Sequence, residues 1–115
     1  MVSVCSATGR SFTLHSLFFQ NGCFLSVAEG DDRIGAVSVS VSSSNKVSTA
    51  KVIPSKNDSM FVNTVAEKVA SMINGICLFS MHCSKPLELE DMKAIMGEVM
   101  NTVSSSDGHE QKVSG

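Results

Sequence analysis

Cysteine and histidine are the residues of this 115-residue chain whose side chains could act as nucleophiles or bases. The four cysteines lie at positions 5, 23, 77 and 83 and contain no Cys-x-x-Cys pair. His82 and Cys83 are neighbours in an expected strand, so their side chains point to opposite faces. Because thiol catalysis needs a base within reach of the sulfur, buried structural thiols are the favoured interpretation. A small thiol enzyme that uses Cys77 or Cys83 is the minor alternative.

The acidic residues do not form a recognisable metal site. The segment from Glu29 to Asp32 carries three carboxylates, but it lacks the ligand spacing of a calcium loop and is better explained as a solvated turn. Glu88, Glu90 and Asp91 lie at the start of an expected helix, where negative charge favours the helix dipole. We therefore predict no catalytic residue, no metal, no cofactor and no enzymatic activity.

Charge and hydropathy exclude further classes of protein. The net charge is -2 and the nine basic residues are scattered, which argues against a nucleic-acid partner. The sequence contains no apolar run near the ~20 residues that a membrane span needs. The first nine residues lack the basic start and apolar run of a signal peptide. We expect a protein of the cytosol or nucleus with reduced thiols.

Turn-forming residues divide the first half of the chain into four expected strands, at residues 11–19, 23–28, 33–42 and 47–53. Asn21-Gly22 between the first two strands is a strong hairpin signal. Pro54 ends the fourth strand because it has no N–H to donate to a sheet. Since the links between these strands are short, an antiparallel meander is the simplest topology.

The second half of the chain predicts two helices around a fifth strand. The first helix begins near Asp58 or Ser59, either of which could cap it, and stops at Asn74-Gly75. Residues 76–83 are apolar on both faces, which favours a central strand. The second helix covers about 87–103, and residues 104–115 are expected to be a disordered polar tail. The prediction is one α+β domain over residues 1–103, in the order ββββαβα, with two helices on one face of an antiparallel sheet.

Each expected helix carries one apolar stripe at helical period. The stripes consist of Val62, Val65, Ala66, Val69, Met72 and Ile73 in the first helix, and of Leu89, Met92, Ile95, Met96, Val99 and Val103 in the second. Because of their apolar character, Val37, Val39 and Val41 are expected on the sheet face that these helices cover.

The other face of the sheet is then left without a covering layer. On the second and third strands it would present Phe24, Ser26, Ala28, Ala36, Ser38 and Ser40. These residues carry no charge, and a sheet face in water usually does. We predict that they form a dimer interface against a partner's sheet, ~10 Å away. The alternative, that small serines simply face solvent, stays open.

Several short segments resemble the proteasome assembly chaperone 3 family. They lie in the same order over residues 9–103 and include residues 23–27, 33–37, 47–53, 65–69, 76–83 and 92–95. The related proteasome assembly chaperone 4 has a similar layout and is an open alternative. The polar stretch 42–46 departs from the family in length and detail.

The resemblance implies a non-enzymatic chaperone with an antiparallel sheet and helices on one side. It implies a sheet-against-sheet dimer, commonly a heterodimer of two related chaperones, although a homodimer is not excluded. It also implies binding to an alpha-type subunit during assembly of the 20S proteasome. Another small interaction scaffold, of the profilin or roadblock type, is the alternative.

Overall fold

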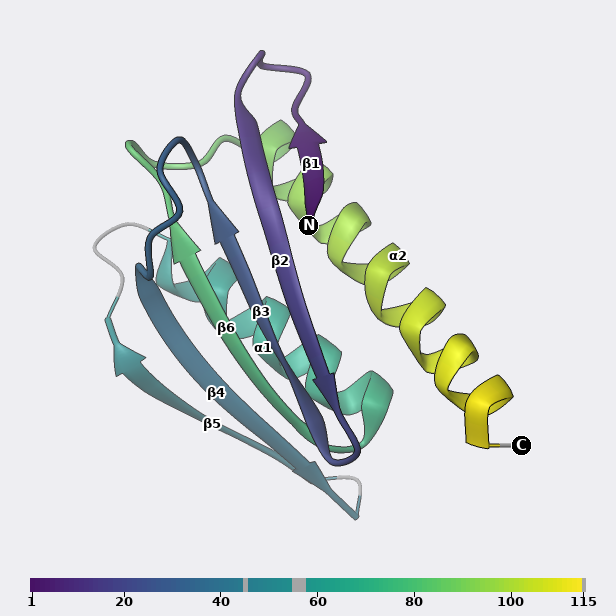
Figure 1. The fold of residues 1–115 in the computed structure, drawn as a ribbon. Coiled ribbons are helices and arrows are strands. Elements are labelled where there is room, and N and C mark those ends of the chain that lie inside the picture. The colour runs from purple at the N-terminus through teal and green to yellow at the C-terminus, as the bar shows by residue number, and fades with distance from the viewer. Residues whose placement is uncertain (45, 55–57, 115) are drawn as a thin grey trace.

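The computed structural model describes residues 1–44, 46–54 and 58–114, and their side chains up to Ser105. The elements, in chain order, are β1 (Val2–Cys5), β2 (Ser11–Phe19), β3 (Gly22–Ala28), β4 (Ala36–Ser43), β5 (Lys46–Ile53), α1 (Ser59–Ile73), β6 (Ile76–His82) and α2 (Leu89–Ser114). They form one six-stranded sheet with both helices on the same side (Figure 1). The predicted α+β architecture is confirmed.

The sheet order, β1-β2-β3-β6-β4-β5, differs from a meander. β6 lies between β3 and β4, parallel to the first and antiparallel to the second. The central position predicted for this strand is confirmed by its pairing on both sides, although only the face with Cys77, Phe79 and Met81 lies in the core. The expectation that the first four strands pair in succession is wrong at β3 and β4. Their connection crosses the end of β6, where the Glu29 N–H donates to the His82 carbonyl at 2.8 Å.

β1 is a sixth strand that the sequence analysis missed. It pairs antiparallel with β2, from Val2 opposite Leu14 to Cys5 opposite Ser11. Val4 is buried in the core. Alternation of Val2 and Val4 with polar residues was the available signal, but four residues are too few to distinguish a strand from a loop.

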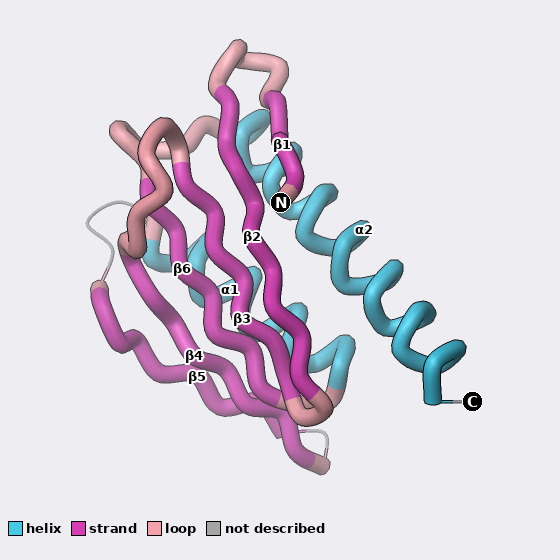
Figure 2. The backbone as a smooth tube through the Cα atoms, viewed as in Figure 1, coloured by secondary structure: helices cyan, strands magenta, loops and turns pink. Residues whose placement is uncertain are grey.

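Figure 2 shows the two helices beside the six-stranded sheet. The hydrophobic core is built from side chains of the sheet and of both helices. α1 packs on β4, β5 and β6, and α2 packs on β1 and β2. Most residues of the predicted stripes are buried, namely Val62, Val65, Ala66 and Val69 in α1, and Ile95, Val99 and Val103 in α2. One end of each stripe is not buried, because Met72 is 44% and Leu89 65% exposed.

α1 begins and ends at the residues that the sequence predicts, but only its C-terminal end is capped in the predicted way. Asn74 adopts the left-handed conformation with φ 50°, which confirms the predicted stop. Asp58 is the N-cap residue, but its side chain makes no capping hydrogen bond. Its carboxylate instead accepts the Leu87 N–H at 3.3 Å, so it ties the start of α1 to the segment before α2.

α2 continues to Ser114, beyond the predicted end at Val103. Val103 is the last residue of its buried stripe. The helical segment after it is rich in Ser and polar residues and carries no apolar stripe in its sequence. The disordered tail at 104–115 and the domain boundary at 103 stay predictions, since Gly115 and the side chains after Ser105 lie outside the described residues. In the described part of the chain no helix is long and apolar enough to cross a membrane.

Candidate interaction surface

The side of the sheet away from the helices has no covering layer of helices, and we call it the open face. Alternation along each strand sends every second side chain to it. The register aligns these side chains across the sheet, with Leu17 opposite Phe24, Phe24 opposite Leu78 and Leu78 opposite Val39. On β2, β3, β6 and β4 the open face comprises Thr13, His15, Leu17, Phe19, Phe24, Ser26, Ala28, Ile76, Leu78, Ser80, His82, Val37, Val39 and Val41. None of these residues is Asp, Glu, Lys or Arg, whereas on the edge strand β5 Lys46 lies opposite Ser43 and adds one charge to this side of the sheet.

The six residues predicted to share an interface lie on two different faces. Phe24, Ser26 and Ala28 of β3 belong to the open face. The β4 residues lie under α1, because they align with core residues of β6: Ala36 with Met81, Ser38 with Phe79, and Ser40 with Cys77.

Hydrogen bonds explain how serines are tolerated beneath α1. The Ser38 hydroxyl donates to the Asn63 Oδ1 of α1 at 2.6 Å. Ser40 is fully buried and shares a hydrogen bond of 2.8 Å with Thr49. Satisfied hydroxyls cost little to bury.

The expectation that Val37, Val39 and Val41 face the helices is wrong, because Ser38 and Ser40 occupy that side of β4. Because β6 lies between β3 and β4, the side chains of β4 that face the helices cannot be inferred from those of β3. A shift of one residue in strand pairing moves every side chain of the strand to the opposite face of the sheet.

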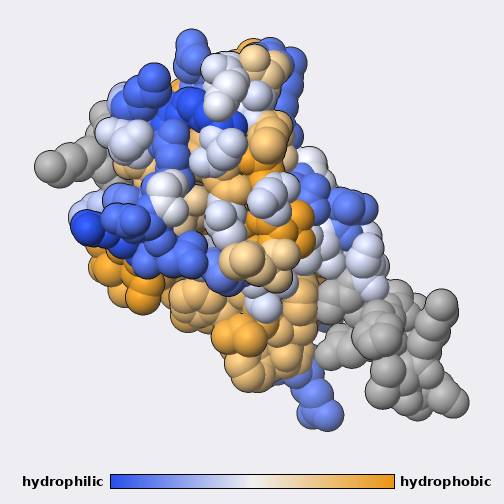
Figure 3. Space-filling model, turned by 45° about the horizontal axis from the view of Figure 1, so that its top comes forward, coloured by the Kyte–Doolittle hydropathy of each residue, from blue (hydrophilic) through white to orange (hydrophobic). Residues whose placement is uncertain are grey.

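The open face is apolar at the end near the β2–β3 turn. There, Leu17 and Phe19 are 62% and 59% exposed, and Val41 is 40% exposed. Figure 3 shows apolar side chains gathered over the lower part of the molecule, beneath a hydrophilic band. We call this region the apolar patch, and it consists of Leu17, Phe19, Phe24, Ile76, Leu78, Val39 and Val41.

A shallow groove lies within the apolar patch. Its volume is about 240 Å³, and Phe19, Phe24, Ile76 and Leu78 line it together with the Asn21–Cys23 backbone. Gly22 permits the close approach of β3 and β6 at its floor, because a Cβ at this position would lie 2.2 Å from the Ile76 carbonyl oxygen. The groove has room for one apolar side chain of a partner.

The opposite end of the open face is partly covered by the β3–β4 connection. Asp32 of this connection places its Oδ2 3.1 Å from the His15 Nε2. Ala28 is only 1% exposed. Of the residues predicted for the interface, Phe24 and Ser26 therefore remain partly accessible candidates on the open face.

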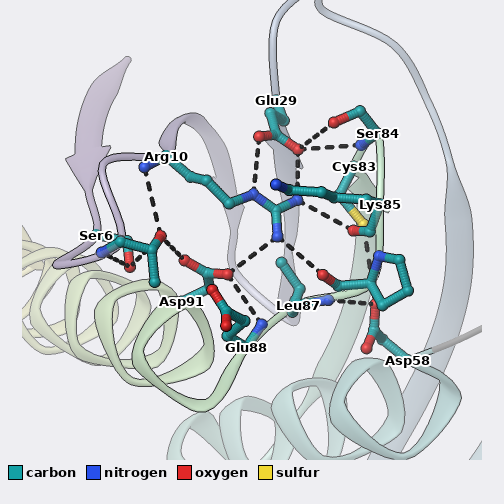
Figure 4. Close-up of polar contacts among 12 residues, drawn as sticks. Ser6, Arg10, Glu29, Asp58, Cys83, Ser84, Lys85, Leu87, Glu88 and Asp91 are labelled. Atoms are coloured by element: carbon teal, nitrogen blue, oxygen red, sulfur yellow. Dashed lines mark hydrogen bonds and ion pairs between the residues drawn. The ribbon is translucent and has the colours of Figure 1, made fainter.

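A buried polar cluster at one end of the sheet is a second place where function could reside (Figure 4). Arg10, just before β2, donates two hydrogen bonds to Glu29, at 2.9 and 2.6 Å. It donates another to Asp91 of α2 at 3.0 Å, and two more to the carbonyl oxygens of Lys85 and Pro86. These bonds occupy all five guanidinium donors. The cluster is a clamp within the fold, with no donor of Arg10 left for a ligand.

The clamp shifts the protonation equilibrium of its carboxylates. The Arg10 hydrogen bonds are the main cause that lowers the pKa of Glu29 to about 2, against the opposing effect of burial, and Ser84 adds hydrogen bonds of its own. Burial alone would raise the pKa of Asp91. Hydrogen bonds from Ser6, Thr8 and the Glu88 N–H, with the charge of Arg10, outweigh it and hold that pKa at about 2. Both groups are thus carboxylates at neutral pH.

No sequence signal pointed to this clamp. Arg10 and Asp91 are separated by 81 positions. The cluster depends on the tertiary arrangement that brings the start of β2 beside α2.

The environment of Cys77 and Cys83, the two thiols considered for catalysis, argues against thiol chemistry. Cys23 and Cys77 are directly opposed on β3 and β6 and are buried in the core. Burial raises the pKa of Cys83, and the charge of Asp58 raises it further. Because the thiolate is the nucleophile, a raised pKa lowers reactivity near neutral pH. In the part of the chain that the structure describes, no three His, Cys, Asp or Glu side chains are grouped so that they could hold a metal ion.

The fold and the surface together define an α+β protein whose sheet carries helices on one face and an exposed apolar patch on the other. No family model and no curated protein matches the chain. A chain from the crystal structure of a novel chaperone complex for yeast 20S proteasome assembly matches the fold with a TM-score of 0.51. The sequences are 10% identical, and the match covers 90% of this chain and 97% of that chain. At this identity the likeness shows a shared fold.

Proposed function

We propose that this chain is a non-enzymatic assembly chaperone that dimerises through the apolar patch and binds an alpha-type subunit during assembly of the 20S proteasome. The observation that carries the proposal is the apolar patch itself, on a sheet whose structural neighbour belongs to a chaperone complex for that assembly. The match of fold over nearly the full length of both chains supports the same conclusion. The sequence resemblance noted above points to the same family.

The chemistry of the open face favours another sheet as the partner. The apolar patch contains no Asp, Glu, Lys or Arg, so a second apolar layer can cover it without burying unpaired charge. Two sheets pack face to face ~10 Å apart, with interdigitating side chains. The exposed Leu17 and Phe19 stand beside a groove that could receive such side chains from the partner. A second copy or a related chaperone chain meets these requirements.

The proposed dimer acts by transient docking. It presents its sheet edges and loops to a proteasome subunit and leaves when a later subunit competes for the same surface. Such contacts are typically of moderate size and partly electrostatic. The chain needs no catalytic group for this role.

Affinity capture from cells tests the proposal. The tagged chain should recover alpha-type proteasome subunits, without mature particles, together with a second chaperone chain. Phe24→Glu in the apolar patch should lose the chaperone partner, whereas Leu89→Glu, at an exposed position on α2, should retain it. Recovery of actin-like, motor or GTPase-complex proteins instead would favour the profilin or roadblock alternative and overturn this proposal.

A further inference from the structure

β5 leaves one edge of the sheet open. It is the last strand in the sheet order and pairs with β4, and no strand of the described residues lies on its other side. Seven of its eight residues are exposed. The opposite edge differs, since β1 has only four residues and α2 packs beside it. An edge strand exposes N–H and C=O groups that can pair with another extended chain.

The composition of β5 suits strand addition. It contains neither proline nor glycine, and Val47, Val52 and Ile53 are all exposed. Its two charged residues, Lys46 and Lys51, are both basic and exposed. Lysines on an edge discourage pairing between two copies of the same strand, because like charges come onto one seam. They attract an acidic strand instead.

A pocket lies at the C-terminal end of this edge. Its volume is about 470 Å³. Ile34, Ile53, Pro54 and Met81 line it together with polar residues, among them Asp58, His82 and Ser84. Ile34 is 68% exposed. In recognition by strand addition, main-chain hydrogen bonds supply affinity and such pockets supply specificity.

We propose that the β5 edge binds an extended acidic segment of a partner protein, which adds a seventh strand to the sheet and places an apolar side chain in the pocket beside Ile53. Two carboxylates lie near this strand. Glu67 of α1 accepts a hydrogen bond from Thr49 at 2.9 Å, and Asp58, which lines the pocket, accepts one from the Leu87 N–H at 3.3 Å. Lys46 and Lys51 are the charged residues of β5 itself, and both are exposed. This site shares no residue with the apolar patch, so a dimer that covers only the apolar patch leaves the β5 edge accessible.

Synthetic peptides test the proposal on the full chain. The probe is a fluorescent peptide of the same length as β5, eight residues. Its sequence alternates valine with glutamate and ends in isoleucine. Binding is measured by fluorescence anisotropy, and its location by amide chemical shifts in NMR. We expect saturable binding with shifts in β5 and around Ile53. The double variant Lys46→Glu, Lys51→Glu should weaken binding by about tenfold or more, since it reverses both charges.

Matched controls distinguish strand addition from simple charge attraction. A peptide with lysine in place of glutamate should bind far more weakly. A peptide N-methylated at alternate residues on its pairing side keeps the charge but loses the donors, and it should not bind. Lys93→Glu on α2 should leave affinity unchanged, because Lys93 lies outside β5.

Three outcomes would overturn the proposal. They are no saturable binding of the acidic peptide, equal binding of the N-methylated peptide, and shifts confined to the apolar patch. Concentration-dependent shifts in β5 without peptide would show that a second copy occupies the edge, which also contradicts it. If the β5 edge does not bind the peptide, the proposed dimer through the apolar patch is unaffected, because the β5 edge and the apolar patch have no residue in common.

Discussion

At the scale of single residues, Arg10 is the most consequential side chain that the sequence did not single out. It is 9% exposed and connects Glu29, which follows β3, with the segment before α2 and with α2 itself. A complete buried ion pair adds little net stability, but removing one partner leaves the other charge buried without compensation. Glu29 and Asp91 would both lose their shared cation.

Arg10→Met should therefore destabilise the fold strongly. Methionine keeps much of the aliphatic stem but removes every donor of the clamp. We expect a loss of about 3–5 kcal/mol in the free energy of unfolding, measured by urea denaturation. Arg33→Met is the control, since Arg33 is exposed and pairs only loosely with Asp31 at 3.8 Å, and should change stability by under about 0.5 kcal/mol. Equal effects of the two variants would contradict the clamp.

The clamp also predicts a dependence of stability on acid. The folded pKa of Glu29 and of Asp91 is about 2, below the ordinary values of 4.5 and 3.8. A depressed pKa contributes stability that is fully present above the ordinary value and is lost as pH falls through the folded value. Unfolding free energy should thus fall between about pH 4.5 and 2. Glu29→Gln should lower stability at neutral pH and flatten this fall, and an unchanged slope would contradict the assignment.

At the scale of elements, the sequence predicted where strands and helices end better than it predicted which side of the sheet their side chains face. The Asn21-Gly22 turn and the Asn74-Gly75 stop fall where expected, because glycine and asparagine signals are local. β1 was missed for its shortness. The phase of β4 was predicted wrongly, since it depends on which strand pairs with it, and β6 follows β4 by a helix and another strand. The clamp and the pocket beside Ile53 likewise depend on contacts between distant segments.

Charged substitutions on β4 test its phase. Ser40→Asp places a carboxylate beneath α1, where Ser40 is fully buried, and should cost about 3 kcal/mol or more. Val41→Asp points to the open face, where Val41 is 40% exposed, and should cost under about 1 kcal/mol. Chemical denaturation of dilute protein measures both without a contribution from dimerisation. The reverse order would restore the interpretation that the valines face the helices.

At the scale of the whole molecule, the sheet is protected on one face and one edge. The helices cover the first, and the short β1 with α2 beside it limits the second. The apolar patch and the β5 edge are both exposed and lie in different parts of the sheet. Under the two proposals above, the chain would pair with a chaperone through the apolar patch and bind a third protein at the β5 edge. The sequence predicted an uncharged sheet face from composition. It placed Ala36, Ser38 and Ser40 of β4 on that face, whereas the structure places them under α1.

Self-association is the property of the whole molecule that the apolar patch predicts most directly. Leu17→Glu introduces a charge at a 62% exposed position within the patch, and should weaken pairing with a second copy or a related chaperone chain by at least about tenfold. Leu89→Glu makes the same change at a 65% exposed position on α2 and should not affect pairing. Sedimentation equilibrium over a range of concentrations measures both, and circular dichroism verifies that each variant is folded. If both variants pair as the unmodified chain does, or if that chain stays monomeric alone and with related chaperones, the apolar patch is not the dimer interface.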